Sequence, residues 1–357
     1  MTEKRKFLIF LSQFDFTYSK FKQIVDFMEE PLSIKSFCKT KFDEKILSHE
    51  MFERMKSKCE EQRLENYIHN LENEDVFVLT ELDEDYPDKL RDLLDKPFFL
   101  FGKGDKSLLN KPSLSVVGSR KPTSYGRMVT TKIVREMAEQ GVVIISGLAY
   151  GVDSIAHRTC LDVNGKTIAV LGSGFKEIYP SEHQSLADEI ALKGLLLSEY
   201  PPEKRATKYT FPQRNRIIAG LSDGVLITEA GYRSGTIHTK DFALDYGKNI
   251  YAIPGNIDSE LSSLPNDIIK SGQGQCVLSS QDILQDYDLS RKSSPQKAVE
   301  LSFEEQSIVS FLEDGMKDIE FLSKNCNLST NLLNSYLTTL EIRGIINRLP
   351  GGFVSLC

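Results

Sequence analysis

The sequence predicts an α/β protein in three parts: a mostly parallel β-sheet domain, a small helical domain before it and a winged-helix-like domain after it. Three observations support this prediction. Short apolar runs alternate with longer amphipathic stretches through the middle of the chain. Helical spacing of apolar residues dominates the first 75 residues, and the C-terminal end has the pattern of three helices and a hairpin.

The composition is that of a soluble, intracellular protein. At about 150 residues per domain, 357 residues predict two or three domains. The six cysteines include no Cys-x-x-Cys pair, so neither a disulfide framework nor a zinc site is indicated, and we expect a cytoplasmic location. The apolar run from Phe7 to Leu11 is shorter than a signal-peptide core of about 7 to 15 residues. No run is long enough to cross a bilayer, so no membrane partner is expected.

The first element is a helical domain over residues 1–75. Phe21, Ile24, Val25 and Met28 follow a helical period, which Pro31 interrupts.

The second element, residues 76–285, is the predicted sheet domain. Its strand candidates are 114–117, 142–145, 167–171, 195–198, 225–228 and 250–253. Several of these strands end in small or polar residues, namely Gly118-Ser119, Ser146-Gly147, Gly172-Ser173-Gly174 and Glu229-Ala230-Gly231. Because the carboxyl ends of parallel strands lie along one edge, we expect these turns to converge on a single binding site.

The turn after the first of these strands suits phosphate. Gly118 and Ser119 allow a tight turn, and Thr123 with Ser124 can cap the following helix, whose free N–H groups then point outward. Arg120 adds a planar fork of donors that fits phosphate oxygens. The whole chain has a net charge of −7, but residues 111–216 contain 15 basic and 10 acidic residues and so carry +5. A solvated surface would also explain that excess.

The third element follows a polar linker over residues 286–300. Residues 301–357 predict helices over 303–312, 319–324 and 329–342, then a hairpin of 345–349 and 353–356 around Pro350-Gly351-Gly352. Such a winged helix is common in DNA-binding proteins. The expected recognition helix has no Lys or Arg before Arg343, so a protein contact or a structural role is favoured over direct DNA reading.

Ordered sequence blocks across residues 76–285 resemble the DprA/Smf family of DNA-processing proteins. The blocks are GSRKP (118–122), SGLAYGVD (146–153), IAH (155–157), IAVLGSG (168–174), YP (179–180), LSEYPP (197–202), FPQRNRIIAGLS (211–222) and RSGT (233–236). Two stretches depart from the family pattern and put the floor of the pocket in doubt: residues 237–240 are bulkier and more polar, and residues 266–273 vary a late conserved element.

The resemblance implies an extended Rossmann-like domain that binds and protects single-stranded DNA and loads the RecA recombinase onto it during natural transformation, as a homodimer without a cofactor. It also implies a helical N-terminal domain of the SAM or HhH type. The DNA-binding residues that it implies are Gly118, Ser119, Arg120, Lys121, Gly147, Gly151, Gly172, Ser173, Gly174, Arg214, Asn215, Arg216, Ser234, Gly235 and Thr236. Phe211, Tyr209 and Tyr232 are candidate base-stacking residues, with packing in the core as the alternative.

An enzyme is the alternative interpretation. The sheet resembles that of nucleoside-monophosphate phosphoribohydrolases, whose glycine-rich loop carries an essential Glu; aligning on Gly235-Thr236 places Thr239 there. A hydroxyl cannot stabilise a developing cation as a carboxylate does, so we expect no enzymatic activity and no catalytic residue.

Other candidate catalytic side chains are expected to be structural. Asp153 and His157 are interpreted as a helix-capping residue and a core hydrogen-bonding residue, not as a metal site. Glu199 and Glu229 are interpreted as partners of Arg214 and Arg216.

Overall fold

The computed structural model describes residues 2–14, 16–28, 32–287, 302–313, 315–326, 328–342, 345–349 and 352–356. The chain divides into two compact units, 1–289 and 290–357. The predicted domain boundary at residue 75 therefore runs inside one compact unit. Pro31 and nearly all of the predicted linker, from residue 288 to 300, lie outside the described residues.

Five helices open the first unit: α1 (Glu3–Leu11), α2 (Tyr18–Phe27), α3 (Ile34–Lys39), α4 (His49–Lys56) and α5 (Glu61–Asn73). The first four begin at side-chain caps, Thr2, Thr17, Ser33 and Ser48, whose hydroxyls accept a backbone N–H. Their core is aromatic, and it continues onto strand β2 (Phe99–Gly104) through Phe99 and Phe101. This shared core joins the helices to the sheet.

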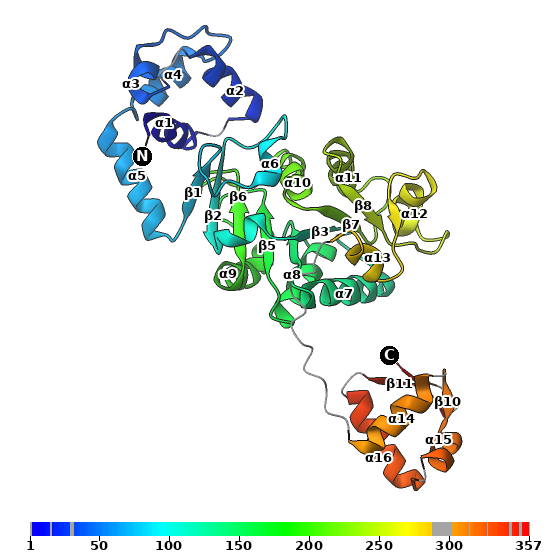
Figure 1. Cartoon of the computed structure of the whole chain (residues 1–357). Coiled ribbons are helices and arrows are strands. Elements are labelled where there is room, and N and C mark those ends of the chain that lie inside the picture. The colour runs from blue at the N-terminus through cyan, green and yellow to red at the C-terminus, as the bar shows by residue number, and fades with distance from the viewer. Residues whose placement is uncertain are drawn as a thin grey trace. The chain divides into compact units, whose positions relative to one another are not determined.

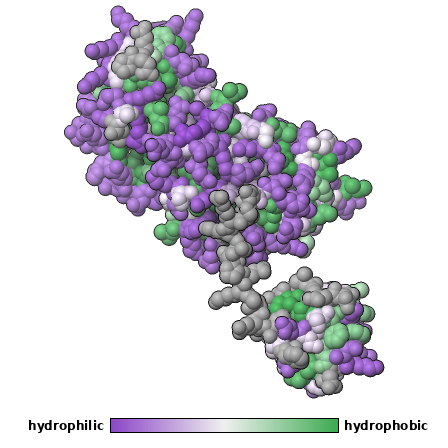
Figure 2. Space-filling view, in the orientation of Figure 1, coloured by the Kyte–Doolittle hydropathy of each residue, from purple (hydrophilic) through white to green (hydrophobic). Residues whose placement is uncertain are grey.

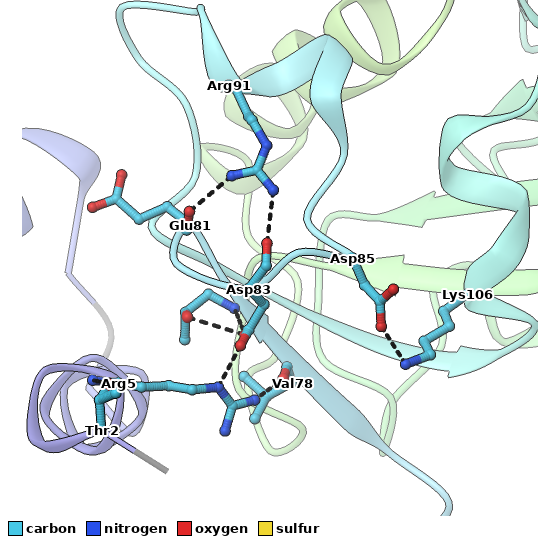
Figure 3. A network of polar contacts seen from close by, with 9 residues as sticks. Thr2, Arg5, Val78, Glu81, Asp83, Asp85, Arg91 and Lys106 are labelled. Carbon is cyan, nitrogen blue, oxygen red and sulfur yellow. Dashed lines mark hydrogen bonds and ion pairs between the residues drawn. The ribbon is translucent and has the colours of Figure 1, made fainter.

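A polar network also fixes α1 to the sheet (Figure 3). The Arg5 guanidinium lies 2.6 Å from Asp83 Oδ1 and donates to the Val78 carbonyl oxygen at 3.2 Å. Asp83 also accepts from the Thr80 amide at 2.7 Å, and the Asp83 carbonyl accepts from Arg91 at 2.7 Å. One carboxylate thus connects the first helix with strand β1 (Phe77–Thr80) and its following loop.

The sheet of the first unit has nine strands in the order β1-β2-β6-β5-β4-β3-β7-β8-β9 within the described residues (Figure 1). β1 and β2 are antiparallel to their neighbours, and all the others pair in parallel. The remaining strands are β3 (Ser113–Val117), β4 (Val143–Ser146), β5 (Thr167–Leu171), β6 (Leu195–Ser198), β7 (Gly224–Ile227), β8 (Asn249–Ala252) and β9 (Gln275–Cys276). All six predicted strands are confirmed as β3 to β8, whereas β1, β2 and β9 were not predicted.

Helices cover both faces of the sheet, as Figure 1 shows. The helices α7 (Ser124–Glu139), α8 (Val152–Asp162) and α9 (Gln184–Lys193) pack on one face, and α10 (Thr210–Leu221) and α11 (Thr236–Asp245) on the other. Shorter elements complete the unit: α6 (Asp88–Arg91), α12 (Ser263–Lys270), α13 (Gln281–Leu284), η1 (Lys106–Asn110), η2 (Ser181–His183) and η3 (Glu260–Ser262). On the face shown in Figure 2, hydrophilic residues cover most of this unit.

The chain changes direction across the sheet between β3 and β7. From β3 it proceeds through β4 and β5 to β6 on one side, and then it returns to place β7 and β8 on the other side. In open α/β sheets, ligands bind at such a switch point, outside the carboxyl ends of the strands. The ends of β3 and β7 are therefore the expected position of a site.

The second unit is a winged helix, as predicted. It contains α14 (Phe303–Glu313), α15 (Ile319–Asn325) and α16 (Thr330–Ile342), with a sheet in the order β10 (Lys317–Asp318), β12 (Phe353–Leu356), β11 (Ile346–Leu349). Its core consists of Ile308, Leu312, Leu322, Leu333, Leu337, Leu340, Ile346 and Val354. Arg343, Pro350 and Gly351 of the prediction lie outside the described residues. Across the described parts of both units, no helix is long and apolar enough to cross a membrane.

Candidate functional site

A cavity with a volume of about 1030 Å³ opens at the switch point. Three segments line most of it: the end of β3 with its turn (117–120), the approach to α10 with its first turns (206–218), and the loop from β7 into α11 (231–239). These segments are far apart in the sequence. Of the strand-end turns that were expected to converge, those after β3 and β7 meet at this cavity, whereas Ser146-Gly147 and Gly172-Ser173-Gly174 do not line it.

The turn after β3 is held tightly against its neighbours. The Ser119 amide donates to the Glu229 carbonyl at 2.6 Å, and the Ser119 carbonyl accepts from Val152 N–H at 3.1 Å. A Cβ on Gly118 would lie 2.8 Å from the Glu229 carbonyl oxygen, so only glycine fits there. Thr123 caps α7 as predicted, because its Oγ1 accepts from Gly126 N–H at 3.1 Å. This packing fixes the position from which Arg120 extends.

Arg214 is a buried residue in the wall of the cavity. Its guanidinium donates to the Gly147 carbonyl at 2.8 Å and to the Val170 carbonyl, and the side chain is 4% exposed. A Cβ on Gly147 would lie within 2.7 Å of that guanidinium. Burial lowers the pKa of Arg214 to about 10, which leaves it protonated at neutral pH. Arg214 therefore contributes a fixed positive charge at the wall.

Asp153 lies beside this arginine at the start of α8. Its carboxylate accepts from the Gly147 amide at 3.1 Å and from the Ala149 amide at 3.3 Å. Burial raises its pKa, although Arg214 and the two amides act in the opposite direction. Asp153 therefore has a structural role, but it does not cap α8 as predicted: the N-cap of that helix is Gly151, without a side-chain cap, and the carboxylate instead holds the loop before the helix.

Three exposed cations face the cavity: Arg120, Lys208 and Arg233. Among the described residues none of them has an ion pair. The carboxylates that line the cavity are Asp153 and Glu260. Helices α7, α8, α10 and α11 also start at this edge, so the positive ends of their dipoles point toward it. The site is therefore suited to an anionic ligand.

Aromatic side chains line the same cavity. Tyr179 and Phe211 have ring centroids 5.4 Å apart, and Tyr179 is 51% exposed. Tyr232 also lines the cavity, while Tyr209 is exposed outside it with Lys208 5.0 Å above its ring. Sequence reasoning identified Phe211 and Tyr232 but not Tyr179, Lys208 or Arg233. The only available signal was their position within or beside the family-like blocks.

Eight of the fifteen predicted site residues line the cavity, namely Gly118, Ser119, Arg120, Arg214, Asn215, Ser234, Gly235 and Thr236. Lys121 is exposed next to the Arg120 turn. Asn215 donates to the Gly235 carbonyl at 3.4 Å, which ties α10 to the loop before α11. The geometry thus brings together the predicted residues of the turn after β3, of α10 and of the loop before α11.

The predicted residues Gly147, Gly151, Gly172, Ser173 and Gly174 shape their loops without lining the cavity. Gly151 has a φ of 77°, and a Cβ there would lie 2.3 Å from the Ser119 carbonyl oxygen. A Cβ on Gly172 would lie 2.8 Å from the Phe211 ring, and one on Gly174 would lie 2.2 Å from the Pro201 carbonyl oxygen. Ser173 is buried and donates to the Glu177 carbonyl at 3.1 Å. These residues act through packing.

Arg216 does not reach the cavity. Its guanidinium lies 2.5 Å from Glu199 and 3.9 Å from Asp95, and it lines a separate pocket beside the N-terminal helices. Two positions along a helix are about 200° apart around its axis, so Arg214 and Arg216 face opposite sides of α10. Arg216 therefore forms an internal ion pair instead of lining the cavity. Its partner is Glu199, for which an arginine partner was predicted.

The prediction for Glu229 is wrong. Its carboxylate accepts from the Thr123 amide at 2.8 Å and from the Thr123 hydroxyl at 2.6 Å, not from an arginine. The cause is the strand order, because β7 lies next to β3 and so delivers Glu229 to the start of α7.

His157 has the predicted core role. Its Nδ1 lies 2.7 Å from Thr167 Oγ1, and that hydroxyl donates to the Ile144 carbonyl, so His157 Nδ1 is the donor. Burial lowers the pKa of His157 to about 3. No group of metal-ligating residues occurs in the described part of the chain.

Together, the fold and the cavity define an α/β protein with an anion-accepting site at its switch point, followed by a winged helix. The chain belongs to the DNA recombination-mediator protein A family, whose model matches residues 77–288. The DprA winged helix domain model matches residues 292–352.

Curated relatives of the same family are similar to this chain in sequence. The chain is 42% identical over 207 residues to DNA processing protein DprA of Streptococcus pneumoniae, covering 58% of this chain and 73% of the relative. It is 36% identical over 285 residues to Protein Smf of Escherichia coli, covering 76% and 75%.

Two solved structures share the fold. DprA from Streptococcus pneumoniae superposes with a TM-score of 0.68 at 32% identity, covering 81% of this chain and 99% of that one. DprA from Helicobacter pylori, whose structure addresses its single-stranded DNA binding mode, gives 0.54 at 33% identity, covering 59% and 97%.

Proposed function

We propose that this chain binds single-stranded DNA in the cavity at the carboxyl ends of β3 and β7. The observation that carries the proposal is the presence of three exposed cations, Arg120, Lys208 and Arg233, without ion-pair partners among the described residues, around a cavity that aromatic rings also line. Cations hold the phosphates and aromatic faces accept the bases, which is the combination that sequence-independent single-strand binding requires.

The cavity favours an unpaired strand over a duplex. Tyr179, Phe211 and Tyr232 line the cavity. A base can stack on one of these rings only if it is not stacked on its neighbours in the strand. In a duplex those bases are paired and stacked on each other, so only phosphate contacts would remain. The single-strand binding mode addressed for the Helicobacter pylori relative supports the same choice.

We further propose that the chain is a cytoplasmic recombination mediator, which protects incoming single strands and loads RecA onto them during natural transformation, as a homodimer. Family membership over residues 77–288 supports this proposal. The cavity itself supports only the binding of single-stranded DNA, not the loading of RecA or the homodimer.

The phosphoribohydrolase alternative receives less support from the site. Thr239, at the position where that chemistry needs a carboxylate, is buried in the cavity lining. Asp153, a buried carboxylate in the cavity lining, is already bonded to two backbone amides. We therefore propose a non-enzymatic role, and release of free base from a nucleoside monophosphate would contradict it.

Fluorescence anisotropy with labelled single- and double-stranded oligonucleotides of one sequence tests the DNA proposal. We expect tighter binding of the single strand, with the logarithm of the affinity falling linearly against the logarithm of salt by about 0.7 for each neutralised phosphate. Equal affinity for both forms, or affinity independent of salt, would contradict the proposal. Faster RecA assembly on a strand coated with single-strand-binding protein tests the loading step separately.

A further inference from the structure

The loop between β4 and α8 presents Tyr150 on a fixed backbone. Leu148 is a non-glycine residue with a φ of 60°, and its side chain is fully buried. The Leu148 carbonyl lies 2.8 Å from Nδ1 of the buried His183. Gly151 follows with a φ of 77° and packs against the Ser119 carbonyl. The backbone on both sides of Tyr150 is therefore held in place.

The Tyr150 side chain is also held, yet it is open to solvent. Its ring meets the His183 ring edge to face, with centroids 5.1 Å apart and planes inclined by 63°. The interaction between the Tyr150 hydroxyl and the Glu182 carboxylate raises the pKa of the tyrosine and lowers that of the glutamate. The residue is nevertheless 40% exposed. A tyrosine held in this way has little side-chain entropy left to lose on binding.

Tyr150 stands at the rim of the cavity, next to a second exposed tyrosine. Its chain neighbour Ala149 lines the cavity, and so does Tyr179. Tyr179 precedes, by four residues in the chain, His183, whose ring contacts Tyr150, so one segment brings both tyrosines to the rim. Tyr179 is fixed in turn against Phe211.

The charges around this rim favour a base over a phosphate. Glu182, whose carboxylate interacts with the Tyr150 hydroxyl, repels phosphate oxygens. The exposed cations Arg120, Lys208 and Arg233 line the cavity itself. A strand that crosses the rim therefore keeps its backbone on the cation side and directs a base toward the tyrosines.

We propose that Tyr150 and Tyr179 form a stacking platform at the rim, which takes an unpaired base of the strand whose phosphates the cavity holds. The inference rests on the proposed single-strand binding and adds a subsite outside the cavity. Base stacking on an aromatic side chain is tolerant of sequence, because every base has a π-face.

The chain contains no tryptophan, which allows a direct test. Tyr150→Trp creates a single fluorophore at the rim, and Phe27→Trp creates one on α2, where Phe27 is similarly exposed at 41%. We expect an oligothymidylate to quench the fluorescence of Y150W, an oligonucleotide with 5-bromouracil to quench it further, and the F27W signal to stay constant. Binding without quenching in Y150W would overturn the proposal.

Affinity supplies the second measurement. Tyr150→Leu is expected to weaken binding of a base-bearing strand by at least about fivefold, and Tyr150→Phe, which keeps the ring, by less than about twofold. With an abasic oligonucleotide, Y150L and the parent protein should bind alike. An equal loss on both oligonucleotides would place the backbone, not a base, at Tyr150 and so overturn the platform. If the parent protein binds no single strand at all, the proposed function fails first.

Discussion

The sheet-edge cavity and the recognition helix of the winged helix differ in what their cations do. Around the cavity, Arg120, Lys208 and Arg233 are exposed and have no ion pair within the described ranges. Helix α16 contains no Lys or Arg, and the nearby Arg348 of β11 is bound back to the helix. Its guanidinium donates to the Asn334 carbonyl at 3.0 Å and to the Thr338 hydroxyl at 2.8 Å, and it lies 3.3 Å from Glu341.

The difference teaches that fold alone does not assign the DNA-binding role. A winged helix is a common DNA reader, but affinity for a polyanion comes chiefly from cations that can release counterions. Arg348 is bonded to the helix that it faces, whereas Arg120, Lys208 and Arg233 have no ion pair among the described residues. This difference supports the proposal that the sheet domain binds the nucleic acid and that the winged helix has a protein-contact or structural role.

Removing Arg120 should have the largest effect. Arg120→Ala deletes a charge-assisted contact to phosphate, so we expect single-strand affinity to fall about 10- to 100-fold. The slope of log affinity against log salt should become shallower by about 0.7. Fluorescence anisotropy over a salt series measures both changes.

Arg348→Ala is the matched control, since it removes the same side chain from the other region. We expect it to leave the affinity and the salt slope unchanged. If the two variants lose affinity equally, the contrast between cavity and winged helix is wrong.

A pH experiment separates the stabilities of the two units. All five histidines lie in the first unit, and His157 is buried with a pKa lowered to about 3. Because the folded pKa lies below the unfolded value, stability is full above about pH 6.5 and is lost as the pH falls toward 3. His157 alone should cost the first unit about 2 kcal/mol between pH 8 and pH 5.

This loss of stability can be measured by urea unfolding at pH 8 and pH 5. The free energy of unfolding of His157→Gln is compared with that of the parent protein. The difference between the two proteins should shrink or reverse at pH 5, since the variant has no imidazole to protonate. Parallel pH profiles for the two proteins would show that folding does not lower the pKa of His157.

Much of the fold could be predicted from the sequence because its parallel strands are short, continuous apolar runs that end in small residues. The run from Leu114 to Val117 before Gly118 is an example, and it is confirmed as β3. Strands β1, β2 and β9 could not be recognised in this way. β2 ends in Gly-Lys-Gly and shares its phenylalanines with the N-terminal helices, and β9 has only two residues.

The site was less predictable because its cations come from irregular segments. Arg120 follows a recognisable strand and turn, whereas Lys208 and Arg233 lie in loops without periodicity. Arg216 shows the opposite error: it is two residues from Arg214 in the sequence but on the other side of α10, paired with Glu199. Helical phase, which depends on where the helix begins, decided between them.

Single removals of Lys208 and Arg233 should give intermediate effects, because each adds one cation to a site that keeps Arg120. We expect Lys208→Ala and Arg233→Ala each to weaken single-strand binding about three- to tenfold and to reduce the salt slope by about 0.7. Anisotropy over the same salt series measures both. Lys193→Ala on α9, which removes a lysine paired with Glu189 at 2.7 Å, controls for net charge. A similar loss in that control would mean that overall charge, not the cavity, governs binding.

The smallest effect is expected from removing the winged helix altogether. A chain that ends at residue 289 keeps the whole first compact unit, including every residue that lines the cavity. Its single-strand affinity should stay within about twofold of the full chain, and its salt slope should be unchanged, since no phosphate contact is lost. Anisotropy on the two proteins, with circular dichroism to verify folding, makes the comparison. A tenfold loss in the folded, shortened chain would show that the winged helix contacts the strand despite its lack of cations on α16, and the division of roles between the two regions would then have to be abandoned.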